Sequence, residues 1–356
     1  MRVYTCTNCS NTLYFENSKC LHCDHPVGFD PATLTMITLK PQAADPALFT
    51  HSSDDSKIYK YCSNAEHGVC NWLLPAEDTS GFCVACAMNR VIPDLDNGIN
   101  LLRWKNIEVA KHRLIYSLLR LKLPFEIVAE EKTESLLFQF MADTPSGEKV
   151  MTGHDNGIIT INVAEADEAE RAKNKYDLGE RYRTLLGHFR HESGHFYWDM
   201  LIRDKPALKK YRQLFGDERQ DYSAALTTYY ENGAPADWNQ RFISPYATAH
   251  PWEDWAETWA HYLHMMDTLE TAWSFGIRID PVELDKTSGI RASILKEPYG
   301  ITDFNKLVNR WLPLCFAVNS LNRSMGHPDF YPFVISPPAI EKLQFIHKLC
   351  QPGLRA

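Results

Sequence analysis

Eight of the ten cysteines of this chain lie within its first 86 residues. The first four occur in the stretch CTNCSNTLYFENSKCLHC as two CxxC pairs, Cys6 with Cys9 and Cys20 with Cys23. A CxxC pair directs two thiolates toward one point, and two such pairs complete the tetrahedral ligand set of a structural zinc site. Clustered cysteines in a reducing compartment indicate metal ligands sooner than disulfides. We therefore predict that this segment folds around a zinc ion.

The next four cysteines, Cys62, Cys70, Cys83 and Cys86, predict a second zinc site of the same kind. The first two are spaced more widely than a CxxC pair, so His67 is an alternative ligand, and an interleaved pairing of the two clusters is a further alternative. Four thiolates leave zinc no open position, so both sites are expected to be structural. A segment this small and polar is expected to need metal to fold. A zinc ribbon here could also dock a protein partner.

Composition limits the classes of function. The net charge is −8, from 37 Lys and Arg against 45 Asp and Glu. This balance, without a basic cluster in the cysteine-rich segment, argues against nucleic acid as a partner. No apolar run approaches the length of a membrane span, and the first residues lack the apolar core of a signal peptide. We therefore expect a cytoplasmic protein without a membrane partner.

The stretch RHESGH, residues 190–195, predicts a catalytic metal site. His191 and His195 are four residues apart, so on a helix both imidazoles lie on one face, one turn apart. Glu192 lies beside them and can take a proton from a water that zinc activates. A catalytic zinc usually has three protein ligands and one open position. The third ligand must therefore come from elsewhere in the chain.

A second stretch, SPYATAHPWEDWAETWAHYLHMM (residues 244–266), offers that ligand. Apolar residues recur at helical spacing after Pro251, and proline suits the first turn of a helix. Glu253 and Glu257 are four residues apart and share a face of this helix. One carboxylate could bind zinc while the other accepts a hydrogen bond from a ligating imidazole. The alternative is a solvated acidic face, which the neighbouring HExxH motif makes less favoured.

HESGH followed by YATAHPWEDWAE resembles the gluzincin class of zinc peptidases, in which a helix after HExxH carries a glutamate ligand and a second acid four residues later. The stretch also has a tyrosine seven positions before that glutamate, and in this respect it resembles anthrax lethal factor and its relatives. The resemblance implies that Glu253 is the third ligand and that Glu257 is the hydrogen-bond partner of a ligating histidine. It also implies that the Tyr246 phenol steadies the oxyanion.

The layout of nearly the whole chain resembles a bacterial family of zinc-binding metallopeptidases with an N-terminal zinc-ribbon segment. This resemblance implies an α+β, zincin-like fold with a small twisted sheet, an HExxH active-site helix and a mainly helical C-terminal half. We expect a zinc-ribbon region at residues 1–95 and a metallopeptidase domain at residues 96–356. The pattern also predicts a helix at 100–121 and strands at 135–143 and 157–163. The strand at 157–163 is expected to be an edge strand that holds an extended substrate.

The expected function is a zinc-dependent peptidase with one catalytic and two structural zinc ions, acting on a peptide or protein. Glu192 would take the proton of the attacking water and pass it to the leaving amine. Two alternatives stay open: a non-catalytic or latent zincin scaffold that binds a partner, and a zinc amidase acting on a non-protein amide. The sequence leaves open the roles of five polar residues near the motifs, namely His188, Asp199, His250, His261 and His264.

Overall fold

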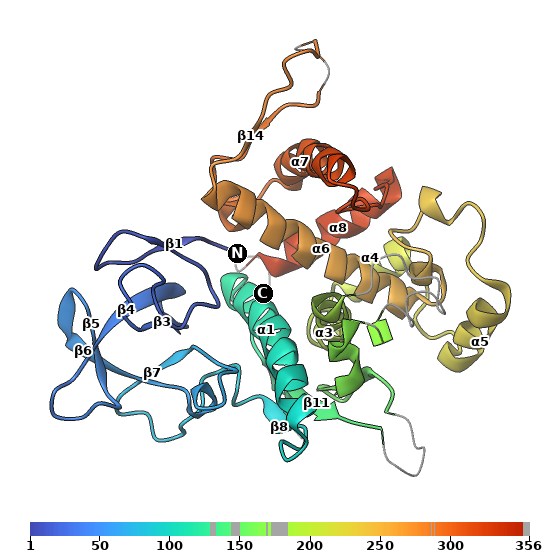
Figure 1. Cartoon of the computed structure of the whole chain (residues 1–356). Helices are drawn as coiled ribbons and strands as arrows, with labels where there is room; N and C mark the ends of the chain where they lie inside the picture. The colour runs from blue at the N-terminus through green and yellow to red at the C-terminus, as the bar shows by residue number, and fades with distance from the viewer. Residues whose placement is uncertain are drawn as a thin grey trace. The chain divides into compact units, whose positions relative to one another are not determined.

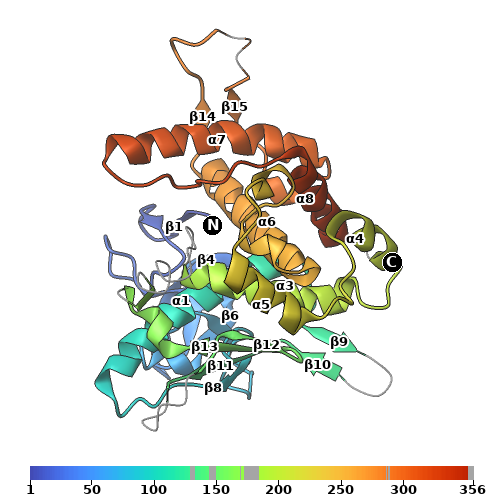
Figure 2. The ribbon, with the colours of Figure 1, turned by 90° about the vertical axis from the view of Figure 1, so that its right-hand side faces the viewer.

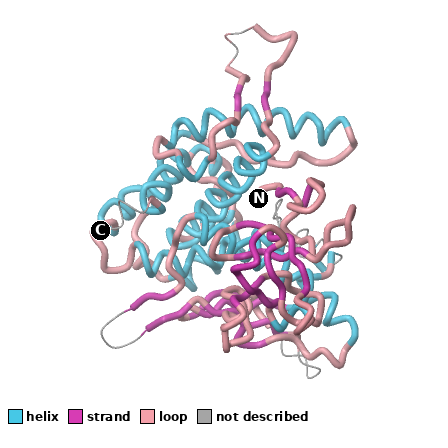
Figure 3. The backbone as a smooth tube through the Cα atoms, turned by 90° about the vertical axis from the view of Figure 1, so that its left-hand side faces the viewer, coloured by secondary structure: helices cyan, strands magenta, loops and turns pink. Residues whose placement is uncertain are grey.

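The computed structural model (Figure 1) describes residues 1–128, 133–143, 150–168, 170–171, 184–285, 287 and 289–351. The chain divides into two units. The first holds residues 1–178 and 184–189, and the second holds residues 179–183 and 190–356. Strands are concentrated in the first unit and helices in the second (Figure 3). The mixture of helix and sheet agrees with the expected α+β class, whereas the domain division at residue 95 stays a prediction.

The cysteine-rich part of the first unit contains a five-stranded antiparallel sheet in the order β3-β4-β5-β6-β7. A small apolar core lies on this sheet, formed by Ile37, Leu39, Tyr59 and Leu73. The sequence pattern did not predict this sheet. Its strands are β3 (Val27–Asp30), β4 (Thr35–Pro41), β5 (Phe49–His51), β6 (Asp54–Tyr61) and β7 (Leu73–Pro75), and a separate two-stranded sheet pairs β1 (Tyr4–Thr5) with β2 (Thr12–Leu13).

Helix α1 (Gly98–Arg120) agrees with the helix predicted at 100–121. The side chain of Asn97 caps it by accepting a hydrogen bond from the backbone N–H of Ile99, as expected for asparagine at an N-cap. The face that carries Trp104, Ile107 and Leu114 is buried. This helix therefore forms part of the core of the first unit, together with the short 3-10 helix η2 (Val163–Ala166), against which it packs.

A four-stranded mixed sheet in the order β12-β13-β11-β8 completes the first unit. Two of its strands match the predicted ones: β11 (Leu137–Met141) and β13 (Ile158–Asn162). The expectation that the second of these is an edge strand is wrong. It lies between β11 and β12 (Gly153–Asp155), which takes up its outer side. The fourth strand of this sheet is β8 (Asn89–Val91). Outside the sheet, β9 (Glu126–Val128) and β10 (Thr133–Ser135) pair with each other as a hairpin.

The second unit is mainly helical, as expected for the C-terminal half. Helix α3 (Leu185–Leu201) enters it at Arg190. Its other helices are α4 (Leu208–Phe215), α5 (Tyr222–Asn232), α6 (Pro251–Ser274), α7 (Phe304–Ser324) and α8 (Pro337–Cys350). A hairpin of β14 (Arg278–Ile279) and β15 (Ala292–Ser293) projects beyond α7 (Figure 2). Besides η2, the described residues form the short 3-10 helices η1 (Ser63–Ala65), η3 (Trp238–Gln240), η4 (Tyr246–Thr248) and η5 (Pro298–Gly300).

Helix α6 is the centre of the second unit and packs against α4, α7, α8 and η4. Trp255, Trp259 and Tyr262 are fully buried along it, at the steps of three and four residues that keep side chains on one face. The apolar face predicted from the sequence is therefore the face that builds the core. No helix in the described part of the chain carries an apolar stretch long enough to cross a membrane.

Candidate metal centre

Helices α3 and α6 approach closely at Gly194, inside the HESGH motif. A Cβ atom at this position would lie 2.9 Å from the Cα of Ala256. Two indoles of α6 bind the same turn of α3: Trp255 Nε1 donates to the Gly194 carbonyl at 2.7 Å, and Trp259 Nε1 donates to Ser193 Oγ at 3.2 Å. The glycine and the two tryptophans thus hold the motif against the first half of α6.

The start of α6 determines where its acidic residues lie. His250 is the N-cap, and its Nδ1 accepts a hydrogen bond from the Trp252 N–H at 3.1 Å. Pro251 occupies the first turn, as the sequence predicts. Glu253 and Glu257 follow on one helix face, and that face meets α3.

Three side chains that the sequence proposes as zinc ligands converge at this contact. His191 Nε2 lies 3.0 Å from Glu253 Oε2, and His195 Nε2 lies 3.5 Å from Glu253 Oε1. One donor atom from each of the three residues lies within 4.8 Å of the other two. The side chain of Glu253 is only 1% exposed, and those of His191 and His195 are 13% and 6% exposed. The structure therefore brings together two stretches that are about 60 residues apart in sequence.

Glu257 approaches the other ring nitrogen of His191. The distance from His191 Nδ1 to Glu257 Oε1 is 2.7 Å, and Ser244 Oγ donates to Glu257 Oε2 at 2.5 Å. A proton on Nδ1 of His191 can form a hydrogen bond with this carboxylate. Nε2 of the same ring then faces Glu253 and can bind a metal ion. This is the usual arrangement around a metal-ligating histidine, where a carboxylate fixes the tautomer.

Tyr222, which the sequence motifs did not indicate, also contacts the centre. Its hydroxyl donates to Glu253 Oε1 at 2.7 Å. The tyrosine comes from the start of α5, 31 residues before the glutamate, and no spacing rule joins the two positions. The motifs do not indicate Ser244 either, although it lies only two residues before Tyr246.

Charge at the centre favours a cation. Burial alone lowers the pKa of His191, but the carboxylates of Glu253 and Glu257 outweigh burial and raise that pKa well above its usual value. Burial alone raises the pKa of Glu253, but the two imidazoles and Tyr222 outweigh it and lower that pKa to about 2. The carboxylates of Glu253 and Glu257 thus stabilise a positive charge between them. Either a proton on His191 or a divalent metal ion can supply this charge.

The residues at the centre fit zinc. Two imidazole nitrogens and one carboxylate oxygen form a donor set that zinc takes in catalytic sites. The buried Oε2 of Glu253 lies 3.0 Å from His191 Nε2. These two atoms belong to two of the three proposed ligands and are close enough to bind one metal ion between them.

The two remaining predicted catalytic residues lie beside this donor set. Glu192 is half-buried on α3, next to His191. Burial raises the pKa of the Tyr222 phenol, and the negative charges of Glu253 and Glu192 raise it further. The ring of Tyr246, in η4, lies 5.9 Å from that of His191. Burial also raises the pKa of Tyr246, so its hydroxyl stays protonated and can donate.

The polar residues whose roles the sequence left open make contacts of their own. His188 pairs with Glu165 in the first unit, Asp199 pairs with Arg203, His250 caps α6, His261 Nδ1 lies 2.7 Å from the Tyr331 hydroxyl, and His264 lies 3.4 Å from Arg190. None of the five belongs to the group of donors formed by His191, His195 and Glu253 within the described residues.

The comparison with protein families supports the zinc site that the geometry indicates. A family model described as "Putative zinc-binding metallo-peptidase" matches residues 100–349, which include the whole donor set. The chain belongs to this family. A second model, described as a zinc-ribbon domain, matches residues 3–97 of this metallopeptidase-family chain.

Relatives of this family member occur in mycobacteria. The chain is 38% identical over 348 residues to an uncharacterized protein of Mycobacterium tuberculosis and to one of Mycobacterium bovis. The similarity covers 98% of this chain and 94% of each relative. No solved structure matches the chain.

In the zinc-ribbon part of this family member, the structure groups the cysteines as the order of the two clusters predicts. One set is Cys6, Cys9, Cys20 and Cys23, and the other is Cys62, Cys70, Cys83 and Cys86. Sulfur–sulfur distances are 3.6 and 3.7 Å in the first set, and Cys70 lies 3.8 Å from Cys83 in the second. All ten cysteines are described, and none of them forms a disulfide. His67 lies outside both groups and pairs with Glu66 at 3.4 Å.

The second cysteine set has a neighbour that the sequence motifs did not indicate. His112 of α1 is buried, and its Nε2 lies 3.4 Å from Cys70 Sγ and 3.9 Å from Cys86 Sγ. Its Nδ1 lies 2.7 Å from the backbone oxygen of Glu108, which fixes the ring. His112 lies within the metallopeptidase match and the second cysteine set lies within the zinc-ribbon match, so the two matched regions contact each other here, inside the first unit.

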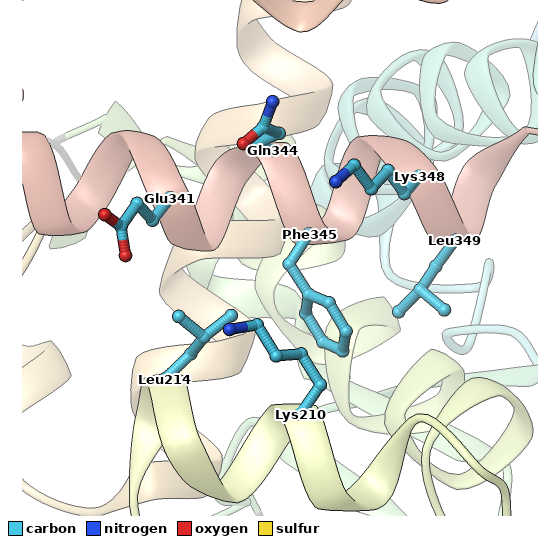
Figure 4. Close-up of a pocket in the computed structure, with 7 residues that line it drawn as sticks. All are labelled: Lys210, Leu214, Glu341, Gln344, Phe345, Lys348 and Leu349. Atoms are coloured by element: carbon cyan, nitrogen blue, oxygen red, sulfur yellow. The ribbon is translucent and has the colours of Figure 1, made fainter.

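A groove between α4 and α8 is separate from the metal centre (Figure 4). It is lined by Lys210, Leu214, Glu341, Gln344, Phe345, Lys348 and Leu349. Figure 4 shows the Phe345 ring and the Leu214 side chain directed between the two helices. No residue of the donor set lines this groove, so we assign it no part in the chemistry of the family.

Proposed function

We propose that the protein is a zinc-dependent peptidase of the gluzincin type. The observation that supports this most is the convergence of His191, His195 and Glu253, with Glu257 fixing the ring of His191. A donor set of two imidazoles and one carboxylate leaves a zinc ion an open position for water, whereas four thiolates do not. The metallopeptidase family match supports the reaction class.

Each residue of the centre has a distinct role in this proposal. His191, His195 and Glu253 hold the ion, and Glu257 orients His191 through Nδ1. The zinc supplies Lewis acidity, which lowers the pKa of water and polarises the substrate carbonyl. Glu192 takes the proton of the attacking water on its carboxylate and delivers it to the nitrogen of the leaving amine. The Tyr246 hydroxyl donates a hydrogen bond to the carbonyl oxygen as negative charge develops there.

The cysteine sets complete the proposed metal content. Each would hold one structural zinc ion, so that the protein binds three zinc ions in all. Both sets use thiolates that are largely buried, and four thiolates leave no position for substrate. The region that carries them remains a proposed docking surface for a protein partner, while the substrate is a peptide or protein.

The Glu192→Gln variant tests the proposal. The amide keeps the shape of the side chain but cannot take up the proton, so hydrolysis is expected to fall by about 10²–10⁴-fold. Zinc content, measured by elemental analysis, is expected to stay at the wild-type value. The substrate mixture is a library of quenched peptides, with new N-termini identified by mass spectrometry.

A matched variant makes the result specific. Glu341→Gln alters an exposed glutamate on α8, away from the centre, and is expected to keep wild-type activity. Cleavage by Glu192→Gln at the wild-type rate would contradict the proposed role of this residue. Loss of zinc from the same variant would show that the substitution disturbs the site rather than the proton transfer.

A further inference from the structure

The two oxygens of the Glu253 carboxylate have different surroundings. Oε1 accepts the hydrogen bond of the Tyr222 hydroxyl at 2.7 Å. Oε2 is buried and lies 3.0 Å from His191 Nε2. A carboxylate can rotate about its last bond and exchange its oxygens unless a partner holds one of them. Tyr222 is such a partner.

We propose that Tyr222 is a positioning residue for the third metal ligand. Its hydroxyl holds Oε1 and thereby turns Oε2 of Glu253 toward His191 Nε2, where the ion is to be held. This inference rests on the proposed function, because it assigns a residue to the metal centre of that function. Outer partners of ligating carboxylates usually affect metal affinity by about 10–100-fold when they are removed.

The fold places the phenol firmly. Asp221 caps α5 by accepting a hydrogen bond from the Ala224 N–H at 2.9 Å, so Tyr222 is the first residue of the helix. The tyrosine ring lies 5.2 Å from the ring of His250 and 5.8 Å from that of Trp252. His250 is the N-cap of α6, and Trp252 lies in its first turn; α6 is the helix that carries Glu253. His250 and Trp252 therefore position both Glu253 and the ring of Tyr222, whose hydroxyl donates the hydrogen bond to Glu253.

The backbone before α5 is tied to the same place. His250 Nε2 lies 3.3 Å from the backbone oxygen of Gln220, two residues before Tyr222. No residue of α5 itself is buried. The helix therefore gains little from a core of its own, and its first turn is held mainly by these contacts with the start of α6.

A Tyr222→Phe substitution separates the role of the hydroxyl from that of the ring. Phenylalanine keeps the ring contacts with His250 and Trp252 and removes only the hydrogen bond to Glu253. If Tyr222 served only to anchor α5, this variant would bind metal as the wild type does. If the hydroxyl orients the ligand, the metal centre itself must change.

The experiment uses the full chain with Co²⁺ as a probe. A mild chelator removes metal from the histidine centre, elemental analysis shows that zinc remains with the cysteine sets, and Co²⁺ is added. The visible d–d absorption of Co²⁺ reports its coordination geometry. Tyr222→Phe is expected to change this spectrum and to weaken Co²⁺ and Zn²⁺ binding by about 10–100-fold. A wild-type spectrum and affinity in Tyr222→Phe would overturn the inference.

Tyr299→Phe is the matched control. It removes another hydrogen bond from a tyrosine to a carboxylate in the same unit, from Tyr299 to Asp267 Oδ1 at 3.0 Å. It is expected to leave the Co²⁺ spectrum unchanged, even where it lowers the melting temperature. Uptake of Co²⁺ by the wild-type protein, together with its loss in the His191→Ala variant, establishes the centre independently of Tyr222. If wild-type protein took up no metal there, both the proposed function and this inference would be wrong.

Discussion

His191 and Glu257 form the contact that most clearly distinguishes this centre from a pair of helices with acidic and basic faces. The distance from His191 Nδ1 to Glu257 Oε1 is 2.7 Å, while the opposite nitrogen of the ring faces Glu253. One carboxylate therefore fixes the ring, and the other shares with it the position at which a metal ion is to be bound. The spacing of four residues between the two acids produces this division, because both lie on one face of α6.

The Glu257→Ala variant is expected to bind zinc about 10–100-fold more weakly at the histidine centre, because the His191 ring loses the partner that fixes its tautomer. Competition with a chromophoric chelator measures this affinity. Glu283→Ala, which removes an exposed acid from the segment between β14 and β15, is the control and is expected to behave as wild type. Equal zinc affinity in the Glu257 and Glu283 variants would show that Glu257 does not support the ligand.

Gly194→Ala tests the close contact of α3 with α6. Helix propensity alone would make alanine more favourable by about 1 kcal/mol. The added Cβ would, however, lie 2.9 Å from the backbone Cα of Ala256, which cannot turn aside as a side chain can. We therefore expect a net loss of about 1–3 kcal/mol in the free energy of unfolding, typical of overpacking, together with weaker zinc binding.

Urea unfolding measures the effect of Gly194→Ala. The control is Gly98→Ala at the first position of α1, where the added Cβ has no atom within 4 Å other than those of its chain neighbours and its own helix backbone. That variant is expected to be as stable as wild type or slightly more stable. A stabilised Gly194→Ala protein with unchanged zinc affinity would mean that the two helices are not packed as closely as described.

His112→Ala tests the contact between α1 and the second cysteine set. The variant loses a buried ring whose Nε2 lies 3.4 Å from Cys70 Sγ, and it leaves a cavity beside the thiolates. In a His191→Ala background, where only the cysteine sets are expected to hold zinc, we expect one of the two ions to be released faster to a chelating dye. His22→Ala, which alters an exposed histidine beside the first cysteine set, should leave both release rates unchanged. Identical release from the His112 and His22 variants would contradict this role.

The parts of the centre that the sequence predicts are those that depend on local geometry. Two histidines four residues apart, and two glutamates four residues apart after a proline, must share helix faces once the helices form. The helices at these positions are present, and the faces meet. Tyr222 and His112 could not be predicted in this way, because each reaches its partner through packing, from 31 and 42 residues away along the chain.

The sheets show a second limit of prediction from sequence. Alternation of apolar residues predicts β13 correctly but does not say which strands will flank it. Its neighbour β12 has only three residues, too few for a recognisable pattern, and this strand removes the edge expected at 157–163. The sequence does not predict the antiparallel sheet of β3 to β7, because the apolar core on it, which includes Ile37 and Leu39, is small.

The most direct test of the central claim is anomalous diffraction from crystals of the zinc-loaded protein, recorded on both sides of the zinc absorption edge. We expect a zinc peak about 2.0–2.2 Å from a nitrogen of His191, a nitrogen of His195 and an oxygen of Glu253, in addition to peaks within the two cysteine sets. Peaks at the cysteine sets with none between these three side chains would contradict it.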